Sequence, residues 1–166
     1  MSKDKFLTVF AVFDNDTQNQ LKLFQKQLFE NGIQGTQIMG IPFHISLGSF
    51  NPEKENFLKK QILNVSNKFK SFDIDLKEMG SFGNKVLFIQ PTVNESLIKL
   101  HELFNDNYAD GFPWHAHTTI LCDEDANVIK ARSLLEKEFK PIPARIIGLQ
   151  MGEFFPARMI IEKKLK

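Results

Sequence analysis

The segment His44-Ile45-Ser46-Leu47 returns 73 residues later in the chain as His117-Thr118-Thr119-Ile120. A second pair of similar segments, 74–82 and 147–154, lies at the same offset apart from one gap. Coincidence between short apolar segments is the simplest explanation of one such match. Two matches at one offset indicate an internal duplication, with two similar lobes related by a pseudo-two-fold axis. Equivalent residues of the two lobes would then face each other across a groove.

Short runs of strand-forming residues alternate with helical periods along the whole chain. Runs rich in aromatic and β-branched residues, such as Phe6 to Phe13, predict strands, and apolar residues at helical spacing, such as Leu21, Phe24 and Leu28, predict helices. The order strand, helix, strand, helix, strand, strand appears twice, and the last strand of the first copy is also the first strand of the second. The expected strands cover residues 6–13, 43–50, 72–79, 86–89, 116–122, 144–152 and 157–163, and helices are expected after capping residues at 14–16, 51–53, 92–95 and 123.

This order predicts the α+β class. We expect residues 1–166 to form a single domain of two pseudo-symmetric lobes flanking a central groove. Each lobe should be an antiparallel sheet with helices on its outer face.

The composition excludes several classes of protein. With 21 Lys and Arg against 20 Asp and Glu, the formal charge is +1, which argues against a protein that grips long duplex nucleic acid. The single cysteine, Cys122, excludes an internal disulfide framework and a cysteine-rich metal site. The segment Met1 to Phe6 does not have the pattern of a signal peptide, and no apolar run approaches ~18 residues, so we expect a cytoplasmic protein without a membrane partner. Nothing in the sequence requires an oligomer, and a monomer is expected.

The repeated motifs place an imidazole and a hydroxyl on one face of each strand. Residues i and i+2 of a strand project to the same side, so His44 lies beside Ser46, and His117 beside Thr119. Two imidazoles across a groove suit phosphoryl transfer without a metal, because the neutral one can accept a proton while the protonated one donates. The hydroxyls can donate to the non-bridging oxygens of a phosphate.

The paired His-x-Ser/Thr-apolar motifs on a duplicated α+β frame resemble the two-histidine (2H) phosphoesterase superfamily. This family includes 2′-5′ RNA ligase-like proteins and cyclic nucleotide phosphodiesterases. The resemblance implies that His44 and His117 are catalytic, that Ser46 and Thr119 bind phosphate, and that no metal or other cofactor is used. The family often has proline just before the second motif; this chain has Ala116, which should point away from the groove.

The resemblance also implies an enzyme acting on a nucleotide or a short RNA. Family members open 2′,3′-cyclic phosphates, cleave 2′-5′ or 3′-5′ phosphodiesters, or join RNA ends by a 2′-5′ link. The sequence does not choose between hydrolysis and ligation, nor does it say which histidine is the base.

Further histidines and the cysteine have several interpretations. His115 should share the face of His117, where it can assist phosphate binding, form a metal-type His-x-His pair, or sit at the rim. His101 is expected to be a surface or edge residue of a helix. Cys122 should alternate onto the buried side of its strand and be inert core.

Four residues near the second motif and the C-terminus are candidates for substrate binding. Trp114 or Phe112 can stack on a base, although core packing is the commoner role of such residues. Phe155 lies in a loop close to the end of the second repeat. Arg158, which follows it, can pair with a phosphate.

Two other functions remain open at this point. A metal-dependent hydrolase would use His115, His117 and His44 with a carboxylate from a loop. A non-catalytic module would bind a nucleotide or RNA in the groove without turning it over. Sensitivity to a chelator separates the first from the two-histidine enzyme, and turnover of a 2′,3′-cyclic nucleotide separates the second.

Overall fold

Seven strands and four α-helices alternate along the computed structural model, which describes residues 4–105 and 113–166. Every expected strand and helix is present, which confirms the α+β class. Within these ranges, no helix is long and apolar enough to span a membrane. In chain order the elements are β1 (Phe6–Phe13), α1 (Asn15–Glu30), β2 (His44–Phe50), the short 3-10 helix η1 (Pro52–Lys54), α2 (Glu55–Lys68), β3 (Phe72–Phe82), β4 (Val86–Pro91), α3 (Glu95–Leu103), β5 (Thr118–Cys122), α4 (Asp125–Glu136), β6 (Ile142–Phe154) and β7 (Arg158–Lys164).

Two of the expected helix caps are wrong. The amide of Thr92 still donates to the carbonyl of Asp75, so α3 begins later and Asn94 is its cap. At α4 the carboxylate of Asp123 accepts from the next amide, one position too early for a helix cap. The residue at the N-cap of α4 is Glu124, whose side chain makes no capping bond.

The strands form one antiparallel sheet whose order is symmetric. The order is β2-β1-β6-β3-β4-β5. β7 lies off this path and pairs with residues 148–153 of β6. Exchanging β1 with β4, β2 with β5 and β3 with β6 leaves this order unchanged, as a duplication requires. The two halves share a continuous sheet instead of forming separate ones, because β6 pairs with β3 through 142–146 and with β1 through 146–154.

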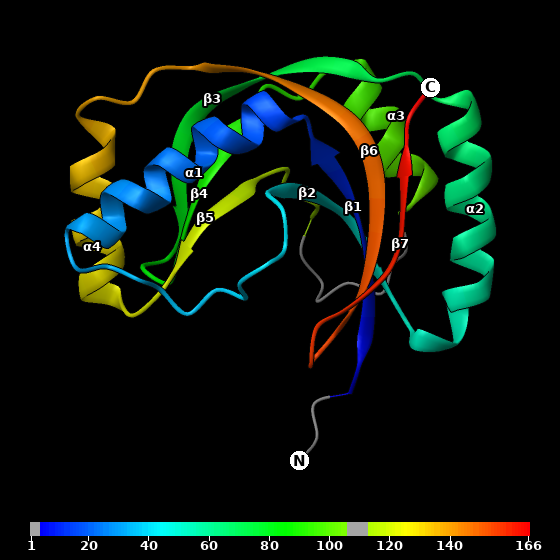
Figure 1. Cartoon of the computed structure of the whole chain (residues 1–166), viewed down its shortest axis with the longest axis horizontal. Coiled ribbons are helices and arrows are strands. Elements are labelled where there is room, and N and C mark those ends of the chain that lie inside the picture. The colour runs from blue at the N-terminus through cyan, green and yellow to red at the C-terminus, as the bar shows by residue number, and fades with distance from the viewer. Residues whose placement is uncertain (1–3, 106–112) are drawn as a thin grey trace.

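Two of the helices, α1 and α3, cross between the two halves of the sheet. α1 packs against β6, β5 and α4, whereas α3 packs against β2. α2 packs against β6 and β7, and α4 packs against β4. Figure 1 shows α1 and α4 together at one end of the curved sheet and α2 and α3 at the other. Each half of the sheet is therefore covered by one helix from each half of the chain.

β1 has apolar residues on both faces, which explains its continuous burial. Its residues Leu7, Val9, Ala11 and Phe13 belong to the main core beneath the helices. Phe10 belongs to a smaller cluster with Val12 and Phe154, and Phe6 packs against that cluster. This second cluster lies on the face that carries the motif histidines.

Each repeated motif contains a β-bulge at its apolar residue. The ladder between β1 and β2 shifts register so that Leu47 has no partner in β1. The ladder between β4 and β5 shifts in the same way at Ile120. Both bulged residues are fully buried. A bulge adds one residue to a strand and bends it, and here it does so beside Ser46 and Thr119.

Candidate functional site

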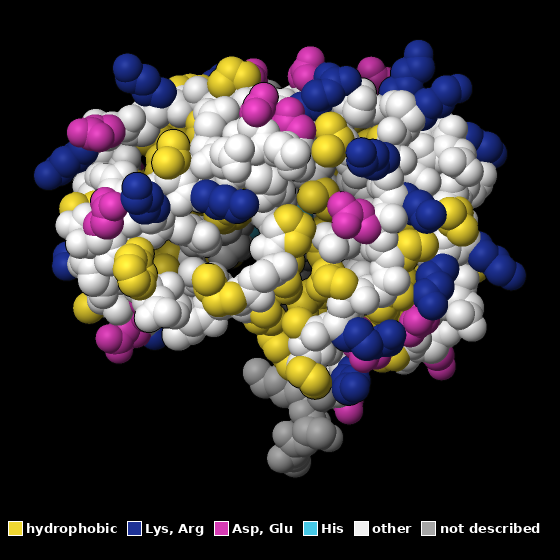
Figure 2. All heavy atoms as spheres, viewed as in Figure 1, with side chains coloured by type: hydrophobic (Ala, Val, Ile, Leu, Met, Phe, Trp, Pro, Cys, Tyr) yellow, Lys and Arg dark blue, Asp and Glu magenta, His cyan; other side chains and the backbone are white. Residues whose placement is uncertain are grey.

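Residues of both motifs line one cavity of about 360 Å³. His44 and Ser46 come from β2, and Thr119 comes from β5. Figure 2 shows hydrophobic side chains gathered near the middle of this face, beside a hollow, with most Lys and Arg around the outer edge. The duplication therefore brings together residues that are far apart in sequence.

The backbone around His44 is fixed by hydrogen bonds. The Nδ1 atom of His44 lies 2.7 Å from the carbonyl oxygen of Pro42. The buried amide of Gln18 donates to the carbonyl of Phe43 at 2.8 Å and accepts from its amide at 2.9 Å. The ring of Phe10 lies 4.2 Å from the imidazole, between centroids.

His117 has matching surroundings at the start of β5. Its Nδ1 atom lies 2.7 Å from the carbonyl oxygen of His115. Its ring centroid lies 4.8 Å from that of Phe82 and 5.3 Å from that of Phe88. Because a carbonyl oxygen only accepts, Nδ1 carries the proton in both motif histidines, and Nε2 is left for chemistry.

The two imidazoles are neutral near neutral pH. Burial lowers the pKa of His44 below its usual value, the bond to Pro42 acts against this, and the charge of His117 lowers it further. Burial likewise lowers the pKa of His117, against the bond to the His115 carbonyl, with an additional decrease from the charge of the His115 ring. The two rings are thus close enough for charge on His117 to act on His44.

The two motif hydroxyls occupy equivalent places in the sheet. Ser46 pairs with Phe10 across the ladder, and Thr119 pairs with Phe88. Both residues are half-buried and line the cavity. Neither hydroxyl makes a side-chain hydrogen bond to another described residue, so both are free to donate to a ligand.

Cys122 lines the cavity, so the prediction that it lies on the buried side of its strand is wrong. Because of the bulge, Ile120 and Leu121 are both buried, and the alternation of buried and cavity-facing side chains is reversed after them. Cys122 is consequently half-buried on the cavity side. Burial raises the pKa of its thiol, so it remains protonated at neutral pH.

Trp114 packs against His101 beside the first motif. The two rings are stacked, with centroids 3.8 Å apart and planes 5° from parallel. The indole Nε1 donates to the carbonyl of Ser46 at 2.9 Å, and Nδ1 of His101 lies 2.8 Å from the carbonyl of Leu47. His101 is half-buried, as expected for an edge residue of its helix. Phe112, the other stacking candidate, lies outside the described residues.

His115 is exposed and does not line the cavity. Its ring centroid lies 6.3 Å from that of His117, with Phe82 and Phe88 beside both rings. Among residues 4–105 and 113–166, no three His, Cys, Asp or Glu side chains are grouped as metal ligands.

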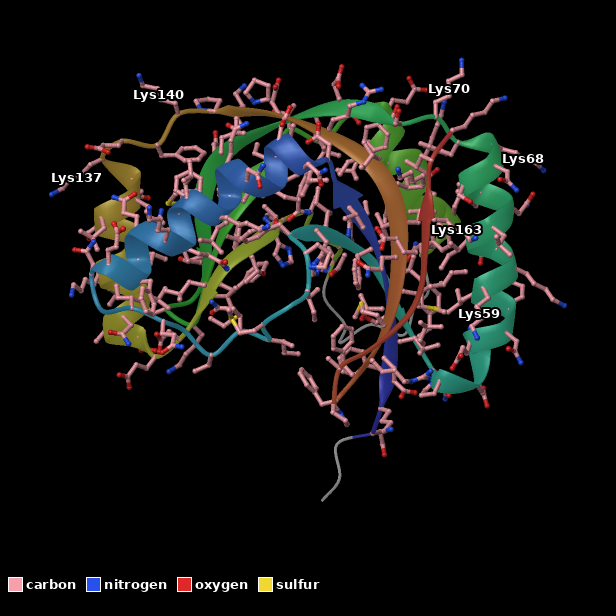
Figure 3. The ribbon with its side chains drawn as sticks, viewed as in Figure 1. Lys59, Lys68, Lys70, Lys137, Lys140 and Lys163 are labelled. Carbon is pink, nitrogen blue, oxygen red and sulfur yellow. The ribbon has the colours of Figure 1, made fainter. Side chains whose placement is uncertain are left out.

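Of the two C-terminal candidates, Phe155 lines the cavity and Arg158 does not. The Phe155 side chain is 51% exposed. The Arg158 guanidinium donates to Glu55 at 3.0 Å and to Glu153 at 3.4 Å, which ties β7 to α2 and β6. Figure 3 shows Lys68, Lys70, Lys137 and Lys140 at the periphery, directed away from the molecule. Within the described part of the chain, the cavity lining contains no Lys, Arg, Asp or Glu.

Sequence reasoning missed the phenylalanines under the histidines. Phe10 and Phe88 are buried strand residues opposite the motif hydroxyls. The sequence does offer a signal for them. If each motif strand pairs with the strand before it, β2 with β1 and β5 with β4, then Phe10 and Phe88 are expected beside the motifs.

Comparison with known proteins agrees with this geometry. The profile of the 2′-5′ RNA ligase superfamily matches residues 35–153, a range that contains both motifs. No curated protein matches the chain significantly in sequence.

Several solved structures have the same fold. E. coli LigT in its apo form is 17% identical, with 99% of each chain covered and a TM-score of 0.64. LigT complexed with 3′-AMP is 14% identical over 99% of each chain, with a TM-score of 0.63. TT0787 of Thermus thermophilus is 14% identical over 96% of this chain and 97% of its own, with a TM-score of 0.62. The order of strands and helices described above is thus shared with known structures along nearly the whole chain.

Proposed function

Because the chain belongs to the 2′-5′ RNA ligase superfamily of phosphoesterases, we propose that it hydrolyses nucleoside 2′,3′-cyclic phosphates, free or at the end of a short RNA, without a metal. His44 and His117 are its general acid–base pair, and Ser46 and Thr119 hold the phosphate. The observation that supports this proposal is the convergence of the two motifs on one cavity, which His44, Ser46 and Thr119 line; His117, two residues before Thr119, is not itself part of the lining.

The reaction proceeds in one displacement at phosphorus. One imidazole accepts a proton from water at Nε2 as the water oxygen attacks phosphorus. The bond from phosphorus to one ribose oxygen breaks, and the other imidazole gives that oxygen a proton from its Nε2. The Ser46 and Thr119 hydroxyls donate to the two non-bridging oxygens as negative charge builds on them. The product is a nucleoside 2′- or 3′-phosphate.

The bound phosphate prepares the histidines for these opposite roles. Both imidazoles have a lowered pKa in the free protein, so both start neutral. A phosphate anion between them favours a proton on one ring and so creates the acid, while the other ring remains the base. The two apparent pKa values of the reaction belong to the pair.

The cavity beside the phosphate site suits a nucleobase. Its walls combine aromatic and aliphatic residues with uncharged polar ones such as Gln25 and Gln37, and carry no Lys, Arg, Asp or Glu among the described residues. They therefore match the flat apolar faces and polar edges of a base rather than a second phosphate. E. coli LigT, which shares the fold, has been solved with 3′-AMP, a nucleotide of this class. The apolar residues that would surround the base are Phe6, Phe10, Ile38, Ile41, Phe154 and Phe155.

The test is hydrolysis of the four nucleoside 2′,3′-cyclic phosphates in excess EDTA, with phosphorus NMR to identify the product. We expect turnover to a single monophosphate isomer. Turnover that is lost in EDTA and restored by a divalent metal would favour a metal-dependent hydrolase. A protein that binds 3′-AMP but hydrolyses neither a cyclic phosphate nor a 2′-5′ or 3′-5′ linked dinucleotide would favour a binding module.

A further inference from the structure

β2 is an edge strand, and its outer backbone groups have no strand partner. The bulge at Leu47 also removes that residue from the ladder with β1. Two consecutive carbonyl groups of the first motif, those of Ser46 and Leu47, therefore need hydrogen-bond donors from elsewhere. Such groups determine where the motif backbone lies and, with it, where the Ser46 hydroxyl lies.

Trp114 and His101 supply these two donors. The indole N–H donates to the Ser46 carbonyl at 2.9 Å, and Nδ1–H of His101 donates to the Leu47 carbonyl over 2.8 Å. The rings are stacked 3.8 Å apart and nearly parallel, so each fixes the plane of the other. The two donors come from α3 and from the segment before β5, elements distant in sequence from β2.

The other half of the molecule has a simpler counterpart. Gln25 of α1 donates from Nε2 to the carbonyl of Ile120, the bulged residue of β5, at 3.3 Å. In each half, a helix that has crossed from the other half of the chain thus donates to the bulge of the motif strand. A donor at the same place twice indicates that bulge position matters for the hydroxyl beside it.

We propose that His101 and Trp114 are positioning residues that hold the Ser46 hydroxyl against the phosphate. They touch neither substrate nor the reacting atoms. This inference rests on the proposed function, because it assumes that Ser46 is a phosphate ligand. It also gives Trp114 a role other than stacking on a base.

The test is a double-mutant cycle read from turnover of a nucleoside 2′,3′-cyclic phosphate. Trp114→Phe keeps an aromatic ring for the stack on His101 and removes only the N–H donor. We expect it to lower kcat about 10-fold, within the range for a small misplacement of a contact in the site. In a Ser46→Ala background the same change should alter kcat less than about 2-fold, because the hydroxyl it positions is gone.

Two matched variants complete the design. In a Thr119→Ala background, Trp114→Phe should keep its full effect, since Thr119 is held by the other half of the molecule. His101→Phe should resemble Trp114→Phe, and His101→Gln, which restores a donor, should recover at least half of the loss. Melting temperatures of all variants show whether any change is a general loss of stability.

Equal effects of Trp114→Phe in the wild-type and Ser46→Ala backgrounds would overturn the positioning role. If the wild-type protein turned over no cyclic phosphate, the proposed function would fail first. The cycle would then be read from the affinity for 3′-AMP, where coupling between Trp114 and Ser46 supports the positioning role and additivity overturns it.

Discussion

Phe10 and Phe88 lie beneath the two motif histidines at equivalent places. The Phe10 ring lies 4.2 Å from that of His44, and the Phe88 ring lies 5.3 Å from that of His117. Each phenylalanine pairs across its ladder with the hydroxyl residue of the same motif. The duplicated unit of the site is thus a phenylalanine, a histidine and a hydroxyl. Burial is the main cause of the lowered pKa of each histidine, and the apolar ring is part of its surroundings.

Replacing either phosphate-binding hydroxyl should weaken catalysis without unfolding the protein. We expect Ser46→Ala and Thr119→Ala each to cost roughly 1.5–3 kcal/mol in kcat/KM, the usual range for a hydrogen bond to a charged group. Neither hydroxyl bonds to another described residue, so its removal leaves no internal group unpaired. Ser133→Ala on the exposed face of α4 is the control. Wild-type kcat/KM in both variants would remove the hydroxyls from the mechanism.

The aromatic wall of the cavity should contribute to base binding. Phe155 lines the cavity and is 51% exposed, so Phe155→Ala should cost little stability. Loss of one stacking contact is worth about 1–3 kcal/mol, and we expect it as a higher KM with kcat nearly unchanged. Phe57 on α2, 65% exposed and not part of the cavity lining, is the matched control. An unchanged KM in Phe155→Ala would place the base elsewhere.

The lowered pKa values of the histidines make stability depend on pH with a definite sign. The unfolded chain takes up protons at His44 and His117 near their usual pKa of about 6.5, whereas the folded protein does so only at lower pH. The stability contributed by the two neutral histidines is therefore fully present above about pH 6.5, and it is lost as the pH falls from there toward their lower folded-state pKa values. Urea unfolding at pH 7.5 and 5.0 should show a smaller loss of stability in His44→Gln than in the wild type. An equal loss in both would show that His44 is not held neutral.

Phosphate binding should reverse this pKa shift in one ring. An anion between the imidazoles stabilises the charged form, so histidine NMR titrations with and without 3′-AMP should show at least one of the two pKa values rising. No change at either motif histidine would mean that the nucleotide binds elsewhere.

Much of the fold follows from local sequence signals. The strand Phe6–Phe13 has the predicted bounds, since a run of aromatic and β-branched residues ends directly at the capping residue Asp14. Asp14 accepts from the amide of Thr17 at 3.0 Å, as predicted. Asn51, expected to cap the second helix, instead accepts from Glu53 at 3.1 Å and caps η1, and Lys54 precedes α2 without a side-chain capping bond. The repeat also predicts which residues converge, because equivalent positions of a duplication meet near its axis.

The features that sequence did not reveal depend on pairing between distant segments. A β-bulge is defined only by pairing with another strand, so the local sequence predicts ordinary alternation at Leu47 and Ile120. Continued past Ile120, that alternation places Cys122 on the buried side of its strand. The contacts of His101 have no local signal, because its partners, Trp114 and the Leu47 carbonyl, belong to other elements. The crossing of α1 and α3 between the halves likewise has no local signal.

The most direct test of the two-histidine mechanism is kcat for a nucleoside 2′,3′-cyclic phosphate, measured in EDTA. The proteins compared are wild type, His44→Asn, His117→Asn and the double variant. Each single change should lower kcat by about 10²–10⁴, the usual contribution of one general acid or base. The double variant should be little slower than either single one, because the two rings act as a unit. His117→Asn or His44→Asn retaining most of the wild-type kcat would contradict the mechanism.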